Sequence, residues 1–243
     1  MLRKDLERYL DEYLKVSQFK DYAPNGLQVE GRTEVRKVVT GVTACQALID
    51  RAIALQADTI LVHHGYFWKS EPTQIVGMKQ KRIKSLLMND INLMGYHLPL
   101  DAHDELGNNA MFGKLLGIKS LEQRDLVHVG ELESPVEIGE FVANVSNVLN
   151  RPALHLPGGP DLVQKIAWCS GGAQRMMSMA LDADVYVSGE VSEDTTHIAL
   201  EEQIHYLSAG HHATEVLGIR ALGEHLAQVF GLDVTFVDVP NPV

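Results

Sequence analysis

The sequence predicts an α/β protein with two lobes, each built on a mainly parallel sheet that helices cover. Residues 37–42 and 58–62 are short apolar runs with a helical pattern between them. This strand–helix–strand order with short connections is typical of a parallel sheet. The order recurs at residues 166–188 as strand, glycine turn, helix, aspartate and strand, which is a weak sign that the lobes are related by duplication. A chain of 243 residues has room for both lobes.

The amino-terminal half is expected to alternate helices and strands. Leu2, Leu6 and Leu10 follow helical spacing and predict a first helix that ends before the turn-rich loop 21–26. Thr43 and Gln46 are spaced as a capping box for the helix after the first strand. The elements expected beyond the second strand are a helix around residues 83–87, a strand at 91–97 and a helix after 109.

The second half repeats this alternation. The expected elements are strand 125–132, a helix from about 136 to 149, strand 166–169, a helix after Gly172, strand 184–188, strand 204–209, a helix to about 230 and strand 234–239. The lobe boundaries follow from the metal site argued below, since Glu215 can join His63 only if the chain returns to the first lobe. We therefore expect a metal-bearing lobe of residues 1–125 and 205–243, and a second lobe of residues 126–204.

Composition and charge exclude several classes of protein. The 21 Lys and Arg residues against 32 Asp and Glu leave a net charge of -11, which disfavours general affinity for nucleic acid. No apolar run approaches the ~18–20 residues of a membrane span, and the amino terminus lacks the apolar core of a signal peptide. Cys45 and Cys169 lie far apart in apolar surroundings and are expected to be reduced thiols of a cytoplasmic protein.

Histidines and carboxylates gather at the ends of predicted strands. The clusters are His63-His64, His97 with Asp101, and His211-His212 with Glu215. In α/β sheets, ligands bind outside the carboxyl ends of the strands. His211 and Glu215 share one helix face at i,i+4 spacing, whereas His212 is rotated away by about 100°. Imidazole and carboxylate are the usual ligands of zinc, manganese and iron, so the clusters predict a metal site.

The adjacent histidines favour two ions rather than one. Side chains of consecutive strand residues point to opposite faces, so His63 and His64 cannot easily bind the same ion. The ligand set that follows is His63, His64, Asp101, His211 and Glu215. These ligands supply at most about seven bonds to two ions that offer about eight sites or more, so a position stays open for water. An open dinuclear site without cysteine is typical of metal-assisted hydrolysis.

Motifs that cover nearly the whole chain point to one family. They are Asn25-Gly-Leu-Gln-Val, Thr40-Gly-Val-Thr, His63-His64-Gly-Tyr-Phe-Trp68, His97-Leu-Pro-Leu-Asp101, Ser188-Gly-Glu190 and Gly210-His211-His212-Ala-Thr-Glu215. With these motifs the sequence resembles the NIF-three-like family of GTP cyclohydrolase I type 2 homologues, especially its short bacterial YbgI-like members. Many relatives have His-Thr-Asn-Leu-Asp where this chain has His97-Leu-Pro-Leu-Asp101, so the groove beside the site is expected to differ.

The resemblance implies properties that the residues alone do not. By position it implies the same five ligands for two divalent transition-metal ions per chain, with zinc, iron and manganese left open. It implies a two-lobed NIF-three-like fold and a toroidal homohexamer whose metal sites face the interior. Together with the open site, it makes the leading function a metal-dependent hydrolase of a nucleotide or related heterocycle, either a cyclohydrolase or a phosphohydrolase.

Two residues are candidates for catalytic roles beside the ligands. His97 is the candidate for proton transfer, and a supporting role next to a ligand is the alternative. Glu190 is a weaker candidate, with helix capping as its alternative. The residues Tyr66-Phe67-Trp68 either join a subunit interface or pack beneath the site within one subunit.

The alternative function is a non-enzymatic toroidal scaffold that binds metal and a nucleic-acid or protein partner. It has one supporting feature, the basic stretch of Lys69, Lys79, Lys81, Arg82 and Lys84. A solvated helix face explains this stretch more simply, so nucleic acid is possible but not favoured as a partner. No membrane partner is expected.

Overall fold

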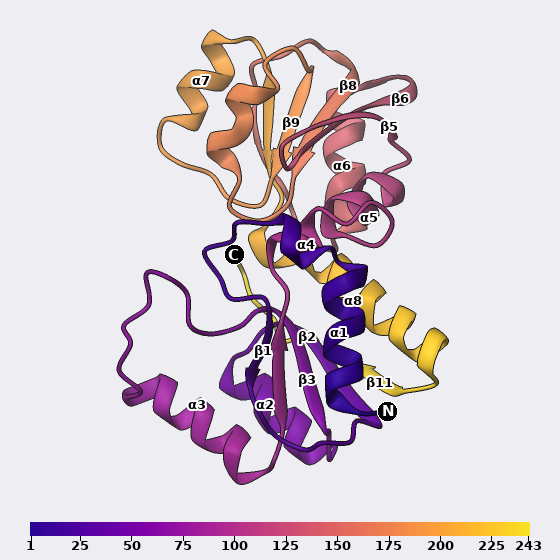
Figure 1. Cartoon of the computed structure of the whole chain (residues 1–243). Coiled ribbons are helices and arrows are strands. Elements are labelled where there is room, and N and C mark those ends of the chain that lie inside the picture. The colour runs from indigo at the N-terminus through magenta and orange to yellow at the C-terminus, as the bar shows by residue number, and fades with distance from the viewer. The chain divides into compact units, whose positions relative to one another are not determined.

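Two β-sheets organise the chain, each in its own unit of the computed structural model, which describes residues 1–243 (Figure 1). The first unit comprises residues 1–107 and 218–240, and the second comprises residues 108–217 and 241–243. The boundaries thus differ from the expected 125 and 205. Residues 108–125 and 205–217 belong to the second unit because they supply strands to its sheet and apolar side chains to its core. No helix in either unit combines the length and apolar character that crossing a bilayer demands.

The first unit holds a five-stranded sheet in the order β1-β4-β3-β2-β11. Its strands are β1 (Gly26–Val29), β2 (Lys37–Thr43), β3 (Thr59–His64), β4 (Asn92–Gly95) and β11 (Asp233–Phe236). Neighbouring strands run parallel except for β1, which is antiparallel to β4. Its helical segments are α1 (Arg3–Tyr13), the 3-10 helix η1 (Val16–Gln18), α2 (Gln46–Ala54), α3 (Gly77–Met88), α4 (Leu98–Asp101) and the carboxyl-terminal part of α8 (His211–Phe230).

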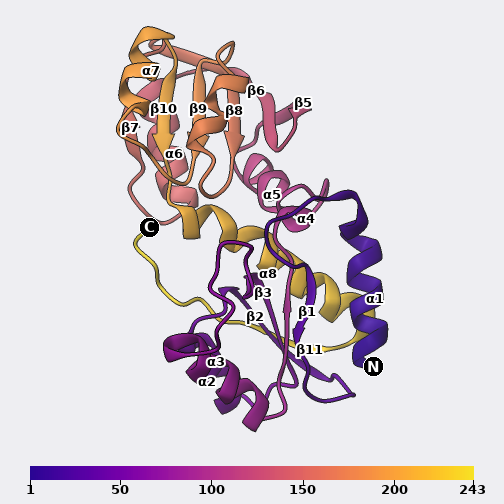
Figure 2. The ribbon, with the colours of Figure 1, turned by 60° about the vertical axis from the view of Figure 1, so that its left-hand side comes forward.

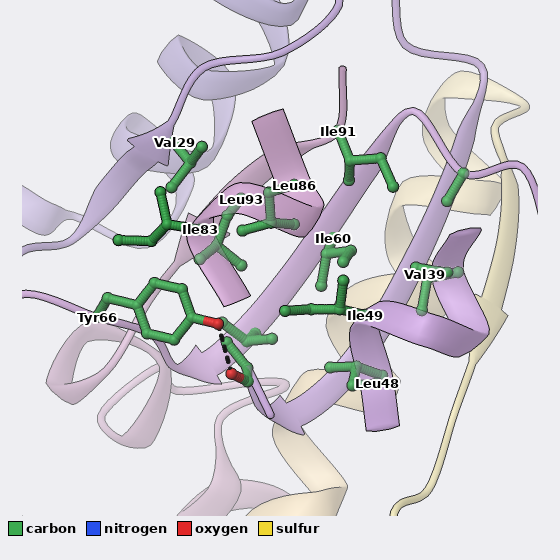
Figure 3. Packing of buried hydrophobic residues seen from close by; sticks show 14 residues of the cluster. Val29, Val39, Leu48, Ile49, Ile60, Tyr66, Ile83, Leu86, Ile91 and Leu93 are labelled. Atoms are coloured by element: carbon green, nitrogen blue, oxygen red, sulfur yellow. Dashed lines mark hydrogen bonds between the residues drawn. The ribbon is translucent and has the colours of Figure 1, made fainter. Parts of the chain in front are cut away.

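Helices cover both faces of this sheet, as a parallel sheet requires. On one face, Ile60 of β3 packs with Leu48 of α2 in an apolar cluster that also includes residues of α3 (Figure 3). Because strand side chains alternate, the buried Leu61 belongs to the opposite face. On the Thr40 side of β2, α8 packs so closely that a Cβ on Gly223 would lie 3.0 Å from Thr40 Cγ2. Figure 2 shows α1 and the end of α8 on the side opposite to α2 and α3.

Helix α2 begins differently from the sequence-based expectation. Its N-cap is Cys45, whose side chain makes no capping hydrogen bond. Thr43 is the last residue of β2, and its hydroxyl lies 3.4 Å from His64 Nδ1. The Gln46 side chain donates to Asp50 instead of reaching back to the helix start. The prediction of a capping box is therefore wrong, because β2 extends through Thr43, the residue that was expected to cap the helix.

The second unit holds a six-stranded sheet in the order β5-β6-β8-β9-β10-β7. Its elements are α5 (Asn108–Leu115), β5 (Lys119–Arg124), β6 (Val127–Glu137), α6 (Ile138–Val148), β7 (Leu154–Leu156), β8 (Leu162–Cys169), η2 (Gln174–Met179), β9 (Val185–Ser188), α7 (Thr195–Glu201), β10 (His205–Ser208) and the start of α8. Only the β8–β9 and β9–β10 pairs are parallel, so this sheet is mixed rather than mainly parallel. The helix expected after Gly172 is the short 3-10 helix η2.

The two sheets share a local plan. In each, three parallel strands (β4-β3-β2 and β10-β9-β8) are flanked by a short antiparallel strand, β1 or β7. Directly before β3, Asp58 Oδ2 accepts the successive backbone N–H groups of Arg36 and Lys37 at 2.9 Å each. Directly before β9, Asp184 Oδ2 accepts two successive N–H groups of β8 at 2.8 Å each. These matching carboxylate clips are what a duplication would leave, and the common origin stays a prediction.

Candidate metal centre

Two adjacent histidines end strand β3. His63 is 1% exposed and His64 is partly exposed. Their ring centroids lie 4.6 Å apart, and ring nitrogens of both and of His97 lie within 4.8 Å of one another. The two rings thus lie nearer to each other than the alternation of side chains along a strand suggests. His64 is the last residue of β3. The number of ions stays a prediction.

A backbone carbonyl fixes the orientation of His63. Its Nδ1 lies 3.0 Å from the carbonyl oxygen of Tyr96, and since a carbonyl only accepts, we assign the proton to Nδ1. Nε2 faces Asp101, whose Oδ1 is 3.5 Å away. Asp101 ends the short helix α4 and is 6% exposed. A histidine held at Nδ1 by a carbonyl, with Nε2 directed at a carboxylate, has the usual arrangement of a supported metal ligand.

His97 is paired with Asp21, a carboxylate that sequence reasoning left in a turn-rich loop. Asp21 Oδ1 lies 2.9 Å from His97 Nδ1 and accepts the N–H of Ala23 at 3.0 Å. Asp21 Oδ2 accepts the N–H of Leu98 at 3.0 Å and the side-chain amide of Asn25 at 3.1 Å. Burial alone would raise the pKa of Asp21, but His97 and these hydrogen bonds outweigh burial and hold the pKa well below its usual range. The result is a buried Asp–His dyad.

The second unit places His211 between two carboxylates. Its Nδ1 lies 2.6 Å from Glu190 Oε1, and its Nε2 lies 3.2 Å from Glu215 Oε1. The second contact follows from the i,i+4 spacing at the start of α8. Burial alone would lower the pKa of His211, but Glu215 and Glu190 outweigh burial and raise the pKa to about 9. Below that pKa both ring nitrogens of His211 carry a proton. A divalent ion would bind Nε2 only after the Nε2 proton leaves.

A glycine turn borders the His211 group. Gly171 has a φ of 66°, and a Cβ there would overlap Glu215 Oε1 and lie 3.2 Å from His211 Nε2. The N–H of Gly171 donates to Thr214 Oγ1 at 2.9 Å, which holds the turn against α8. Only glycine combines this backbone conformation with room for the carboxylate and the imidazole.

The sequence-predicted site residues thus form two groups. The first unit contains His63, His64, His97 and Asp101, and the second contains Glu190, His211 and Glu215. Both groups have the imidazole and carboxylate donors that divalent transition metals prefer, so their chemistry fits such ions. Cys45 and Cys169 form no disulfide and belong to neither group. The union of both groups in one five-ligand centre stays a prediction, as does the role of each ligand.

The three aromatic residues after the histidine pair differ in their surroundings. Tyr66 is 4% exposed, and its hydroxyl donates to the carbonyl of Ala44 at 2.7 Å. The ring of Trp68 lies 5.7 Å from that of His64 and 4.9 Å from that of His97, between centroids. Tyr66 therefore packs into the core of the first unit, and Trp68 borders the histidine group.

Both the sequence and the fold match known proteins. The family described as Duf34/NIF3 (NGG1p interacting factor 3) matches residues 1–242. A Yersinia pestis protein named GTP cyclohydrolase 1 type 2 homolog is 53% identical over 246 residues and covers 100% of both chains. A solved structure described as "protein ybgI, unknown function" has a TM-score of 0.98 and 52% identity, and one from Thermus thermophilus has 0.94 and 36%, each covering 100% of both chains. These matches confirm the α/β fold with two helix-covered sheets.

Proposed function

Because the chain belongs to the Duf34/NIF3 family, we propose that it is a dinuclear-metal-dependent hydrolase that acts on a nucleotide or a related heterocycle. The observation that carries the proposal is the gathering of His63, His64 and Asp101 at the end of β3, with Asp101 Oδ1 3.5 Å from His63 Nε2 and no cysteine beside them. A structural zinc site would be closed and rich in thiolates. The name that the relatives carry supports hydrolytic ring opening of a heterocycle. Phosphoester hydrolysis is the other reaction that such a site suits.

The proposed centre joins the ligands of both units. His63, His64 and Asp101 alone are too few donors for two ions that take about four ligands each. Adding His211 and Glu215 from the start of α8 brings the set to five residues and still leaves a position for water. When bound, the ions would lower the pKa of that water toward ~7 and polarise the bond to be broken. Zinc, iron and manganese all suit this donor set.

In this proposal the His97–Asp21 dyad moves the proton. The Asp21 carboxylate holds the proton at His97 Nδ1, so Nε2 is the atom that takes up or releases a proton during turnover. Burial of the dyad keeps its geometry fixed, since Asp21 is also held by backbone N–H groups on both oxygens. His97 is thus the proposed catalytic residue, and Asp21 acts through it.

Glu190 is a positioning residue in this proposal rather than a catalytic one. It engages His211 Nδ1 at 2.6 Å, which leaves Nε2 as the nitrogen for a metal ion. The carbonyl of Tyr96 does the same for His63. Each supporting contact orients its ring and retains the proton at Nδ1, so that Nε2 is the nitrogen left for an ion.

The scaffold alternative has less support, because its basic stretch is partly engaged within the fold. Lys69 Nζ donates to the carbonyl of Asp21 at 2.8 Å. Lys79 Nζ donates to the carbonyl of Pro72 at 3.0 Å and lies 3.4 Å from Glu71 Oε1. The remaining cations are Lys81, Arg82 and Lys84 of α3, of which Lys81 and Lys84 are exposed.

We further propose that six copies of the chain assemble into a ring in the cytoplasm. Membership of the family supports the ring, and α3 with the segment before it offers a contact surface of exposed apolar side chains, including Ile75, Val76 and Met78. Sedimentation should give a mass near six chains, and chelation of the metals should not change it. A well-folded monomer at micromolar concentration would contradict the ring.

Metal content tests the dinuclear site. Protein loaded with zinc, manganese or anaerobic iron should contain about two ions per chain by elemental analysis. His63→Ala and His64→Ala should each weaken a different ion. A single ion that is lost completely in either variant would contradict the dinuclear proposal.

Turnover tests the hydrolase. Metal-loaded protein should hydrolyse at least one member of a panel of nucleotides and free heterocycles. His97→Asn should keep its metal but lose about 100-fold or more in rate, as expected for a proton-transfer residue. His197→Asn is the matched control, because His197 is an exposed histidine on α7 and should leave the rate unchanged. Fully loaded protein that turns over nothing in the panel would support the scaffold instead.

A further inference from the structure

An aromatic pair lies beside the histidine group of the first unit. The ring centroids of Tyr22 and Trp68 are 5.5 Å apart, with planes tilted by 38°. Each ring also meets the ring of His97 at 74°, with centroid distances of 5.0 Å from Tyr22 and 4.9 Å from Trp68. The pair therefore borders the imidazole that the proposed hydrolase uses for proton transfer.

Hydrogen bonds hold the two aromatic residues next to each other. The backbone N–H of Lys69 donates to the carbonyl of Tyr22 at 2.9 Å, and Lys69 Nζ donates to the carbonyl of Asp21 at 2.8 Å. The indole N–H of Trp68 donates to the carbonyl of Gly65 at 3.0 Å. Because these bonds tie the Tyr22 loop to the Trp68 turn, both rings are positioned before any ligand arrives.

The turn before Trp68 has an unfavourable backbone conformation. Phe67 has a φ of 64°, in the left-handed region that side chains other than glycine disfavour. The carboxylate of Glu71 stabilises the turn by accepting the N–H groups of Phe67 and Trp68 at 2.5 and 3.2 Å. Lys79 Nζ lies 4.8 Å from the Phe67 ring centroid and 3.4 Å from Glu71. Strain that the surroundings enforce in this way is concentrated at functional sites.

Tyr22 is 53% exposed in spite of these contacts. A core role does not explain an aromatic ring that is held in place and yet half in water. Such a surface gains most from a flat, π-rich ligand, because aromatic rings attract one another beyond the area they bury. The neighbouring imidazoles then place the reactive groups at the edge of that ligand.

We propose that Tyr22 and Trp68 bind the planar heteroaromatic ring of the substrate by stacking and hold it next to His97. This inference rests on the proposed hydrolase and adds the two side chains that recognise its substrate through a flat ring of the purine or pyrimidine kind rather than through a sugar phosphate. Stacking tolerates different ring substituents, so the pair selects a planar ring and not one particular base.

Calorimetric binding of GMP, CMP and ribose 5-phosphate tests the stacking role, in metal-free and in zinc-loaded protein. Wild-type protein should bind both nucleotides and bind ribose 5-phosphate at least about tenfold more weakly. Tyr22→Leu keeps an apolar side chain but removes the π face, and should weaken nucleotide binding about tenfold. Tyr22→Phe keeps the π face and should retain affinity within about twofold, and Trp68→Leu should behave like Tyr22→Leu.

Leu200→Ala is the matched control for loss of exposed apolar surface, because Leu200 on α7 is 54% exposed and belongs to neither the site nor the proposed ring contact. Its affinity should equal that of wild type. Circular dichroism checks the fold of every variant. Equal affinity of Tyr22→Leu and Tyr22→Phe, or binding of ribose 5-phosphate as tight as that of GMP, would overturn the proposal. Elemental analysis distinguishes a wrong stacking proposal from a wrong hydrolase proposal. Wild-type protein that binds nucleotides through Tyr22 but holds no metal would contradict the hydrolase and leave the stacking role standing.

Discussion

Replacement of Asp21 by asparagine is expected to destabilise the protein far more than the loss of one loop charge would. The Asp21 side chain is 3% exposed, and each of its oxygens accepts a backbone N–H, from Ala23 on Oδ1 and from Leu98 on Oδ2. Asparagine keeps only one oxygen. Whichever way its amide is turned, its NH2 group therefore faces a backbone N–H that has lost its acceptor.

The magnitude of the effect follows from these contacts. A buried N–H without an acceptor costs about 1–3 kcal/mol, and a hydrogen bond to a charged group contributes about 1.5–3 kcal/mol. Because the contacts share one carboxylate they are not additive, and we expect Asp21→Asn to lower the free energy of unfolding by about 3 kcal/mol at pH 7. Asp104→Asn is the matched control. Exposed Asp104 makes a 3.5 Å contact with Lys15, so its loss should cost less than about 0.5 kcal/mol.

The difference between wild type and Asp21→Asn should also depend on pH in one direction. The pKa of Asp21 is lower in the folded protein than in the unfolded chain, so folding favours the ionised carboxylate. Its stabilisation is complete above the unfolded pKa of about 4 and is lost as the pH falls below that value toward the folded pKa. Urea unfolding should give equal gaps at pH 7 and pH 5 and a smaller gap at pH 3.5. Equal stability at pH 7, or a gap that widens in acid, would refute the reasoning.

His211→Ala should cut zinc affinity strongly and His212→Ala should change it little, because His211 shares the helix face of Glu215 at 3.2 Å and His212 is rotated from that face by about 100°. Equal losses in a calorimetric titration would mean that the ligand choice is wrong. Gly171→Ala should lower zinc affinity and the free energy of unfolding together, since the new Cβ overlaps Glu215 Oε1; unchanged zinc binding would argue against this close approach. Tyr66→Phe should lower the free energy of unfolding in a urea titration by about 1 kcal/mol, because it loses the hydrogen bond to the Ala44 carbonyl. Tyr66→Asp should abolish the folded circular dichroism spectrum, since it places a charge in the core; a folded Tyr66→Asp would contradict the burial of Tyr66.

Local patterns predict the strands that carry the histidines. The apolar runs at 37–42 and 58–62 are the strands β2 and β3, and the histidine pair falls at the end of β3 as expected. No such pattern predicts β5, because residues 119–123 are all exposed and the strand lies at the edge of its sheet. The predicted lobe boundaries differ from those of the two units for a related reason. They depend on which strands pair over long distances, and local periodicity does not contain that information.

At the candidate site, too, contacts within one element follow from the sequence and contacts between distant segments do not. The i,i+4 contact between His211 and Glu215 follows from spacing within one helix. The pairing of Asp21 with His97 joins positions 76 residues apart, and the turn residues around Asp21 predict a loop without indicating what the loop faces. The approach of the His63 and His64 rings runs against the alternation of side chains along a strand, so the period of the strand does not predict it.

The carboxylate clip of Asp58 has a consequence for the opposite end of β3. By accepting the N–H groups of Arg36 and Lys37 where β2 begins, Asp58 locks the register of the two strands, which sets Thr43 opposite His64. A slip of β3 by one residue would exchange the faces of every side chain on that strand. His63 would then turn toward the apolar layer of α2 and α3, and His64 would take its place beside the Tyr96 carbonyl. A largely buried aspartate directly before the strand thus preserves the order of the two imidazoles at its end.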